Sequence, residues 1–281
     1  MHWQTTRHLI DLSRPRVMGI VNVTPDSFSD GGAHASAAAA LAHCEALVRD
    51  GADILDIGGE SSRPGAVRLD AADELRRVMP VLRGALALGV PVSVDTCKAA
   101  VMRAVLDAGA DIVNDIRALR DPGALDAVAA HPSCGVCLMH MQGDPASMQQ
   151  APAYAGDVVA EVAAFLAERV AAVVARGVDA ARIVVDPGIG FGKAPAHNVA
   201  LLARQRELLA LGRPLLVGWS RKSTLGWLTG RPVGERLPAG IAAALAAVQH
   251  GGRIVRVHDV AATADALKMW SAAGLGGEHP A

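Results

Sequence analysis

Eight short apolar runs divide this chain of 281 residues, and polar residues close every one of them. Buried strands have no packing reason to finish in this way each time. A ring of eight parallel strands does, because enzymes of that architecture build their active sites from the carboxyl ends of the strands. The pattern predicts a single α/β TIM barrel, (β/α)8, and the face that carries its active site. The closing residues are Asn22, Asp56, Asp95, Asn114, His140, Asp186 and the segments 220–222 and 256–259.

Helical periodicity fills the intervals between the apolar runs. Glycines 51, 89, 109, 177 and 212 end several of these helices. Such alternation predicts parallel strand pairing through right-handed crossovers. No linker-like break interrupts it, so we expect one domain over residues 1–281 with a core over about 16–273. The expected strands are 16–23, 53–58, 91–95, 111–115, 135–140, 182–186, 214–218 and 253–258; the expected helices are 35–49, 70–88, 98–108, 157–176, 198–211, 238–250 and 261–271, with a weaker pattern over 121–130.

Composition narrows the class of protein. Hydrophobic residues make up 51% and aromatic residues only 3%, so the core must be largely aliphatic, as in a parallel sheet buried on both faces. A formal net charge of −1 gives no global field for nucleic acid. The four cysteines are too scattered for a disulfide framework, and neither a secretory signal nor a membrane-length apolar stretch is visible. We expect a cytoplasmic protein with no nucleic-acid or membrane partner.

Two carboxylates and an amide stand at the ends of three different strands: Asp95, Asn114 and Asp186. In a barrel they converge on one pocket, where they form an acceptor-rich array suited to a flat heterocycle with several N–H donors. The alternative is that each caps the helix that follows, a role for which Asp and Asn are well suited. Their occurrence on three strands favours a binding site.

Cations follow the last two strands. Arg221 and Lys222 come after strand seven, while Arg256 and His258 are two residues apart on strand eight and share a face. Strands seven and eight of such barrels frequently build a phosphate site. The alternative for Arg256 is an ion pair with Asp259 or a neighbouring carboxylate.

Asn22 ends the first strand. Its amide oxygen suits Mg²⁺, which usually keeps waters and shares substrate phosphates. The alternative is a turn-forming asparagine.

Three further motifs are less informative. The segment 188–193, GIGFGK, lacks Walker spacing and is interpreted as a tight turn that lets backbone approach a flat ligand. Cys134 and Cys137 have redox-like spacing but enter a buried strand, which favours core cysteines. His140 has no partner at metal-ligand spacing and is interpreted as a hydrogen-bonded barrel histidine rather than a zinc ligand.

Nearly the whole chain, from about residue 16 to residue 268, closely resembles the dihydropteroate synthase family of pterin-binding barrels. The resemblance implies that 6-hydroxymethyl-7,8-dihydropterin diphosphate condenses with 4-aminobenzoate to give 7,8-dihydropteroate and diphosphate. It also implies a Mg²⁺ cofactor, inhibition by sulfonamides and a homodimer formed through outer helices. The segments that carry it are MGIVNVTPDSFSDGG (18–32), DIGGESSRPGA (56–66), VSVDT (92–96), VNDI (113–116), LMHMQGDP (138–145), DPGIGFGK (186–193), GWSRKS (218–223) and RVHDV (256–260).

The resemblance also implies roles for single residues. Asp95, Lys222, Arg256 and Asp30 are implied to be catalytic, and Asn22 to bind the metal. The implied 4-aminobenzoate pocket comprises Phe28, Ser62, Pro64, Lys222 and Ser223. The implied contacts of the pterin diphosphate are Ser62, Arg63, Asp95, Asn114, Met139, Asp186, Phe191, Gly218, Lys222, Arg256 and His258.

One departure from the family pattern is Ser62, where threonine is usual. Serine keeps the hydroxyl donor and loses a methyl group, so packing around a sulfonamide is expected to loosen. Two other functions stay open at this point: a pterin-dependent methyltransferase domain on the same barrel, and a pterin-binding paralogue without turnover. The cations suited to a phosphate group argue against the methyltransferase. The presence of every expected charged site residue argues against the paralogue without turnover.

Overall fold

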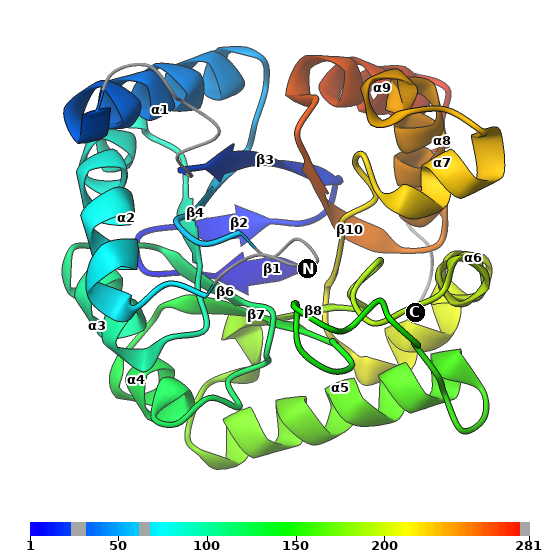
Figure 1. Cartoon of the computed structure of the whole chain (residues 1–281), viewed down its shortest axis with the longest axis horizontal. Coiled ribbons are helices and arrows are strands. Elements are labelled where there is room, and N and C mark those ends of the chain that lie inside the picture. The colour runs from blue at the N-terminus through cyan, green and yellow to red at the C-terminus, as the bar shows by residue number, and fades with distance from the viewer. Residues whose placement is uncertain (24–31, 62–67, 276–281) are drawn as a thin grey trace.

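Parallel strands close into a barrel, and helices surround it (Figure 1). The computed structural model describes residues 1–23, 32–61 and 68–275. Within them the hydrogen-bonded order of the barrel is β10-β3-β4-β5-β6-β7-β8-β9, and every pair in it is parallel. The predicted (β/α)8 TIM barrel is therefore confirmed. The barrel strands are β3 (Arg16–Asn22), β4 (Ile54–Gly58), β5 (Val92–Asp95), β6 (Ile112–Asp115), β7 (Gly135–Met139), β8 (Ile183–Asp186), β9 (Leu215–Val217) and β10 (Gly252–Val257).

The helices lie between these strands in the chain and outside them in space (Figure 1). Asp70 and Asp157 cap two of them by accepting hydrogen bonds from backbone N–H groups. Gly51, Gly89, Gly109, Gly177 and Gly212 all have positive φ, as predicted for residues that end helices. The helices are α1 (Gly32–Arg49), α2 (Ala71–Ala85), α3 (Ala99–Asp107), α4 (Ala124–Ala130), α5 (Val158–Ala175), α6 (Pro195–Ala203), α7 (Ser223–Thr229), α8 (Leu237–Gln249) and α9 (Val260–Ala272), with 3₁₀ turns over Leu86–Leu88, Ala180–Arg182, Gln205–Leu211 and Val233–Glu235.

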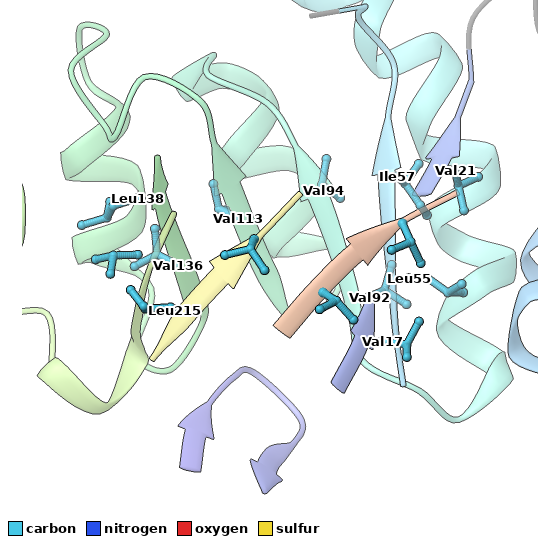
Figure 2. Packing of buried hydrophobic residues seen from close by; sticks show 14 of the residues in the cluster. Val17, Val21, Leu55, Ile57, Val92, Val94, Val113, Val136, Leu138 and Leu215 are labelled. Atoms are coloured by element: carbon cyan, nitrogen blue, oxygen red, sulfur yellow. The ribbon is translucent and has the colours of Figure 1, made fainter. Parts of the chain in front are cut away.

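The main core lies between the outward face of the strands and the helices. Successive strand residues point to opposite faces, so every second residue joins this layer. Figure 2 shows the aliphatic side chains that line it, among them Val17, Leu55, Val92, Val113 and Val136. All five are buried. The low aromatic content is thus met by a core of valine, leucine, isoleucine and alanine, as predicted.

The alternate residues point into the barrel, and their character changes along each strand. Near the amino ends they are apolar, and Met18, Ile54, Ile112 and Ile254 form a second buried cluster. One inward step further along, β4 carries a carboxylate, Asp56. The interior therefore becomes polar towards the carboxyl ends of the strands. We call this polar end the barrel mouth.

A hairpin closes the opposite end. Its antiparallel strands are β1 (His2–Gln4) and β2 (Leu9–Asp11), and Figure 1 shows it lying across the ring. Trp3, Ile10 and Leu12 pack in the same cluster as the apolar inner side chains. The indole Nε1 of Trp3 donates to the carbonyl oxygen of Arg182, 2.8 Å away. The hairpin therefore acts as an apolar plug.

Three elements differ from the sequence-based expectations. The hairpin at residues 2–11 was not predicted. The helix expected over 198–211 begins at Pro195 and becomes a 3₁₀ turn after Ala203, so it forms in two pieces. No helix was expected between residues 218 and 238, yet the short helix α7 begins at Ser223.

Candidate active site

The strand register brings the predicted residues of the first four strands to one level of the mouth. Asn22 pairs with Gly58, Gly58 with Asp95, and Asp95 with Asn114. On the far side of the barrel Met139 pairs with Asp186. Because laterally paired residues of a sheet point the same way, these side chains share the barrel interior.

Asp95 and Asn114 belong to one hydrogen-bonded network with Arg256 and Asp56. Nη2 of Arg256 donates to Oδ2 of Asp95 over 2.9 Å, and its Nε donates to Oδ2 of Asp56 over 2.6 Å. Nδ2 of Asn114 donates to the same Asp56 oxygen over 3.1 Å. The ion pair considered for Arg256 is thus present, but its partners are Asp56 and Asp95, while Asp259 pairs with Arg221 at 2.6 Å.

Burial and charge set the ionisation of this network. Burial raises the pKa of Asp95 to about 7, with the Arg256 guanidinium acting in the opposite direction. Burial by itself would lower the pKa of Arg256, but the nearby carboxylates of Asp56 and Asp95 raise it. Arg256 therefore stays charged, and its charge opposes the effect of burial on Asp95.

Asp186 and Lys222 form the second half of the mouth. Oδ1 of Asp186 accepts a hydrogen bond from the N–H of Gly188 at 2.7 Å, which is a turn contact and not a helix cap. Nζ of Lys222 lies 4.1 Å from the centre of the Phe191 ring, a cation–π contact. Burial lowers the pKa of Lys222 to about 8, opposed by the charge of Asp186, and burial also raises the pKa of Asp186.

The glycine-rich segment 188–193 packs closely against the backbone that follows β7. A Cβ on Gly188 would collide with the carbonyl oxygen of His140, and one on Gly192 with that of Gln142. Both residues have positive φ. The predicted tight turn is therefore present, and the close approach at these two glycines is to protein backbone. The approach of a ligand to this segment stays a prediction. Gly190 instead lies against the Lys222 side chain.

A buried lysine fastens this segment. Nζ of Lys193 contacts Nδ1 of His140 at 2.8 Å and the carbonyl oxygens of Gly188 and Phe191 at 3.0 and 3.1 Å. Burial lowers the pKa of Lys193 to about 7, and burial lowers that of His140 to about 3. His140 is thus a hydrogen-bonded barrel residue, as predicted. The cysteine interpretation also holds, because Cys134 and Cys137 are buried free thiols.

The remaining predicted site residues that the structure describes follow β9 and β10 directly. Nδ1 of His258 lies 3.1 Å from Oγ of Ser220, which also accepts the backbone N–H of His258 at 3.2 Å. Ser223 is exposed at the start of α7, next to Lys222. Phe28, Asp30, Ser62, Arg63 and Pro64 lie outside the described residues.

Sequence reasoning did not assign a site role to Asp56, Ser93 or Lys193. Asp56 and Ser93 are fully buried, and they are register partners on β4 and β5. The sequence could have indicated both residues by their spacing. Each stands two residues before a mouth residue on the same strand, Gly58 or Asp95, and therefore points into the barrel as well. Lys193 was noticed only as the end of a glycine-rich motif.

The mouth can serve a flat, nitrogen-rich ring with an anionic tail. Acceptors come from β5, β6 and β8, and cations come from β10 and the β9–α7 connection. A small hollow, lined in part by Asp95, Thr96 and Ile116, opens beside Asp95. Among the described residues no group of three or more His, Cys, Asp or Glu side chains is arranged to hold a metal.

Comparison with known proteins identifies this combination. A family profile described as pterin binding enzyme matches residues 18–258, so the barrel and its mouth are those of a pterin-binding enzyme. Dihydropteroate synthase of Neisseria meningitidis serogroup B is 52% identical over 279 residues, covering 97% of this chain and 98% of the relative. The chain belongs to the dihydropteroate synthase family.

Two solved structures agree with this assignment. A Yersinia pestis dihydropteroate synthase in a sulfonamide drug complex matches with a TM-score of 0.91 and 46% identity, over 98% of this chain and 99% of that one. A Xanthomonas albilineans dihydropteroate synthase in complex with 7,8-dihydropteroate matches with a TM-score of 0.87 and 50% identity, over 96% and 98%. The likeness extends over almost the full length of each chain.

Proposed function

We propose that this transferase joins 6-hydroxymethyl-7,8-dihydropterin diphosphate to 4-aminobenzoate, giving 7,8-dihydropteroate and diphosphate. The observation that carries the proposal is the mouth itself, where the strand ends Asp95, Asn114 and Asp186 meet two cations. These cations are Arg256 of β10 and Lys222 of the connection after β9. Acceptors suit the N–H edge of a pterin, and cations suit a diphosphate. The family membership supports the same reaction.

The pterin ring is proposed to bind with its N–H groups on Asp95 and Asp186. Asn114 and Lys222 would complete its polar contacts, and the ring faces would lie against Arg256 on one side and apolar surface on the other. Phe191, whose ring already packs against the Lys222 ammonium, would border the same pocket. Met139 and Gly218 occupy inward positions on β7 and just after β9 and would form its floor.

The diphosphate would lie towards the rim, on Arg256 and His258, with Ser62 and Arg63 closing over it. The 4-aminobenzoate would enter beside Lys222 and Ser223, with Phe28, Ser62 and Pro64 completing its pocket and Asp30 nearby. A sulfonamide would compete for this second pocket. The position of His258 supports this division, because it stands one inward step beyond Arg256, just past the carboxyl end of β10.

The chemistry follows from the charges. The C–O bond between the pterin methylene and the diphosphate breaks, and the electron-rich ring shares the developing positive charge. Asp95 and Asp186 stabilise that cation, while Arg256 and His258 stabilise the departing anion; such preorganised charges contribute about 3–4 kcal/mol each. The neutral aniline nitrogen then forms the C–N bond and loses one proton. No strong general base is required.

Mg²⁺ is proposed to bind at Asn22. The residue ends β3 at the level of Gly58 and offers a hard amide oxygen, which fits an ion that takes most of its other ligands from water and substrate phosphate. When bound, the ion neutralises charge on the leaving diphosphate. Asn22 would hold it at the level of Asp95, two strands away around the ring.

We further propose a cytoplasmic homodimer. The outer helix α7 and the turn after it expose Trp227, Leu228 and Val233, an apolar surface of the kind that associates. Sedimentation of the purified protein would test the dimer.

In the described residues no helix has both the length and the apolarity needed to cross a membrane. Four free cysteines accord with a reducing compartment.

A turnover assay tests the function. The protein is supplied with the pterin diphosphate, 4-aminobenzoate and Mg²⁺, and release of diphosphate and formation of 7,8-dihydropteroate are both followed. Equal amounts of the two products are expected. Pterin binding by calorimetry without either product would instead identify a paralogue that has lost turnover. Pterin binding together with methyl transfer would identify the methyltransferase alternative.

A further inference from the structure

Asp56 is a fully buried charged residue next to the mouth, and the reaction outlined above gives it no task. Its exposed fraction is 0%, and it points into the barrel from β4 one inward step below Gly58. A buried carboxylate is costly unless it is paired, so its partners define its purpose. Those partners are Nε of Arg256 and Nδ2 of Asn114, both on Oδ2.

Arg256 is shared between two carboxylates through different nitrogen atoms. Its Nε is bonded to Asp56, and its Nη2 is bonded to Asp95. In the proposed function, on which this inference rests, Asp95 accepts N–H groups of the pterin. The guanidinium and the pterin therefore both draw on the acceptors of Asp95, and we expect the ring to displace Nη2 from Oδ2 as it binds. The bond to Asp56 has no such competitor.

Asp56 also has acceptor capacity to spare. Among the described residues nothing donates to its Oδ1, and its register partner Ser93 likewise has a buried hydroxyl without a partner. A guanidinium that turns away from Asp95 can thus engage both oxygens of Asp56, since a carboxylate accepts two parallel N–H bonds from arginine. The hydrogen bond that Arg256 loses at Asp95 is then replaced by a second one to Asp56, one inward step below the mouth.

We propose that Asp56 is a positioning residue, a fixed pivot that keeps Arg256 in the mouth while Asp95 is transferred from the guanidinium to the pterin. Asp56 acts through Arg256 and does not touch the reacting atoms. Without the pivot, a bound pterin leaves Arg256 with no buried anchor, so its guanidinium no longer lies reproducibly against the ring and the diphosphate. Asn114, bonded to the same oxygen, loses part of its orientation as well.

A double-mutant cycle tests this dependence. Asp56→Asn keeps the shape of the side chain and removes its charge, and Arg256→Gln removes the guanidinium. Asp56→Asn is expected to lower kcat/KM for the pterin diphosphate about tenfold or more, because small displacements of a positioned group cost up to about 100-fold. The KM for 4-aminobenzoate should change little. In the Arg256→Gln background the same substitution is expected to have almost no effect.

Asp53→Asn provides the matched control. Asp53 precedes the same strand at the end away from the mouth, and it too pairs with arginines, Arg16 at 2.9 Å and Arg14 at 2.6 Å. Its loss should lower thermal stability without changing the kinetic constants. The proposal is overturned if Asp56→Asn lowers kcat/KM by the same factor with and without Arg256, or if it behaves kinetically like Asp53→Asn.

A measurement on the unmodified protein covers the case in which Asp56→Asn does not fold. Exchange of the Arg256 Nε–H with solvent is followed by NMR, without ligand and with 6-hydroxymethyl-7,8-dihydropterin bound. Slow exchange in both states is expected, because the Nε–Asp56 bond persists. Fast exchange once the pterin binds would overturn the pivot. If the wild-type enzyme forms no dihydropteroate, the proposed function fails instead, and the two failures are distinguishable.

Discussion

At the scale of single residues, two properties of a strand position decide what its side chain does: whether it points into or out of the barrel, and how near it lies to the mouth. Outward residues of the strands are aliphatic and pack under helices, whereas inward residues change from apolar to polar towards the mouth. Asp95, Asn114 and Asp186 could be selected from the sequence because each closes an apolar run. Their hydrogen bonds could not, because a helix cap and a network across the barrel require the same residue types.

The role of Asp56 shows where residue-level reasoning ends. The sequence marks it as one more polar strand ending. Its pairing with Arg256 depends on the strand register. The register brings Nε of Arg256 to 2.6 Å from Oδ2 of Asp56, although the two residues are 200 positions apart in the chain. A register shift of one residue would turn Asp56 outward. Sequence patterns alone do not determine that register.

Lys222 offers a prediction at this scale. Lys222→Ala removes a cation that faces Asp186 and packs on Phe191. We expect kcat/KM for the pterin diphosphate to fall about 10- to 100-fold, the value of a charge-assisted hydrogen bond. Lys268→Ala is the control, because Lys268 is exposed on α9 and bonds only Asp265 in its own helix. Unchanged kinetics for Lys222→Ala would contradict the proposed pterin contact.

At the scale of elements, the connections carry the site and the strands hold the connections in place. The segment 188–193 is an example, since Lys193 bonds to carbonyl oxygens within it and to His140 at the end of β7. The sequence predicted a tight turn from its glycines. It did not indicate that the following lysine is buried, because a lysine after a loop is ordinarily exposed.

Lys193→Met tests this anchoring. The free energy of unfolding is expected to fall by about 1–3 kcal/mol, because buried carbonyl oxygens lose their donor. Burial lowers the folded-state pKa of Lys193 to about 7, below its unfolded value of about 10.4, so the unfolded chain binds more protons between these values. Wild-type stability relative to the variant should therefore rise with pH above 7.

Chemical denaturation at several pH values between 6 and about 10 provides the measurement. Stability differences that stay constant over this range would show that Lys193 does not titrate as its burial implies. The KM for the pterin diphosphate should also increase in the variant, since Phe191 and Gly190 position the Lys222 side chain. An unchanged KM would restrict Lys193 to a role in stability.

At the scale of the whole molecule, the two ends of the barrel have separate tasks. The mouth carries the polar residues, and the β1–β2 hairpin plugs the other end with Trp3, Ile10 and Leu12. The alternation of strands and helices was sufficient to predict the barrel. The hairpin escaped prediction because strands of three residues carry too little periodicity to be recognised.

Trp3→Ala tests the separation of the two ends. Removing this fully buried indole is expected to lower the free energy of unfolding by about 3–5 kcal/mol, because a cavity opens among the inner aliphatic side chains. Turnover at moderate temperature should be unaffected. Leu9→Ala is the control, since Leu9 lies in the same hairpin with 67% of its surface exposed. Equal stability losses in both variants would contradict the plug.

One measurement tests the central claim, that the mouth receives a pterin on its acceptors and a diphosphate on its cations. It is a crystal structure with a non-hydrolysable pterin diphosphate analogue and 4-aminobenzoate bound. The account predicts that the ring donates to Asp95 and Asp186, and that Arg256 has left Asp95 but still contacts Asp56. A ring bound elsewhere, or one that leaves the Arg256–Asp95 pair intact, would contradict it.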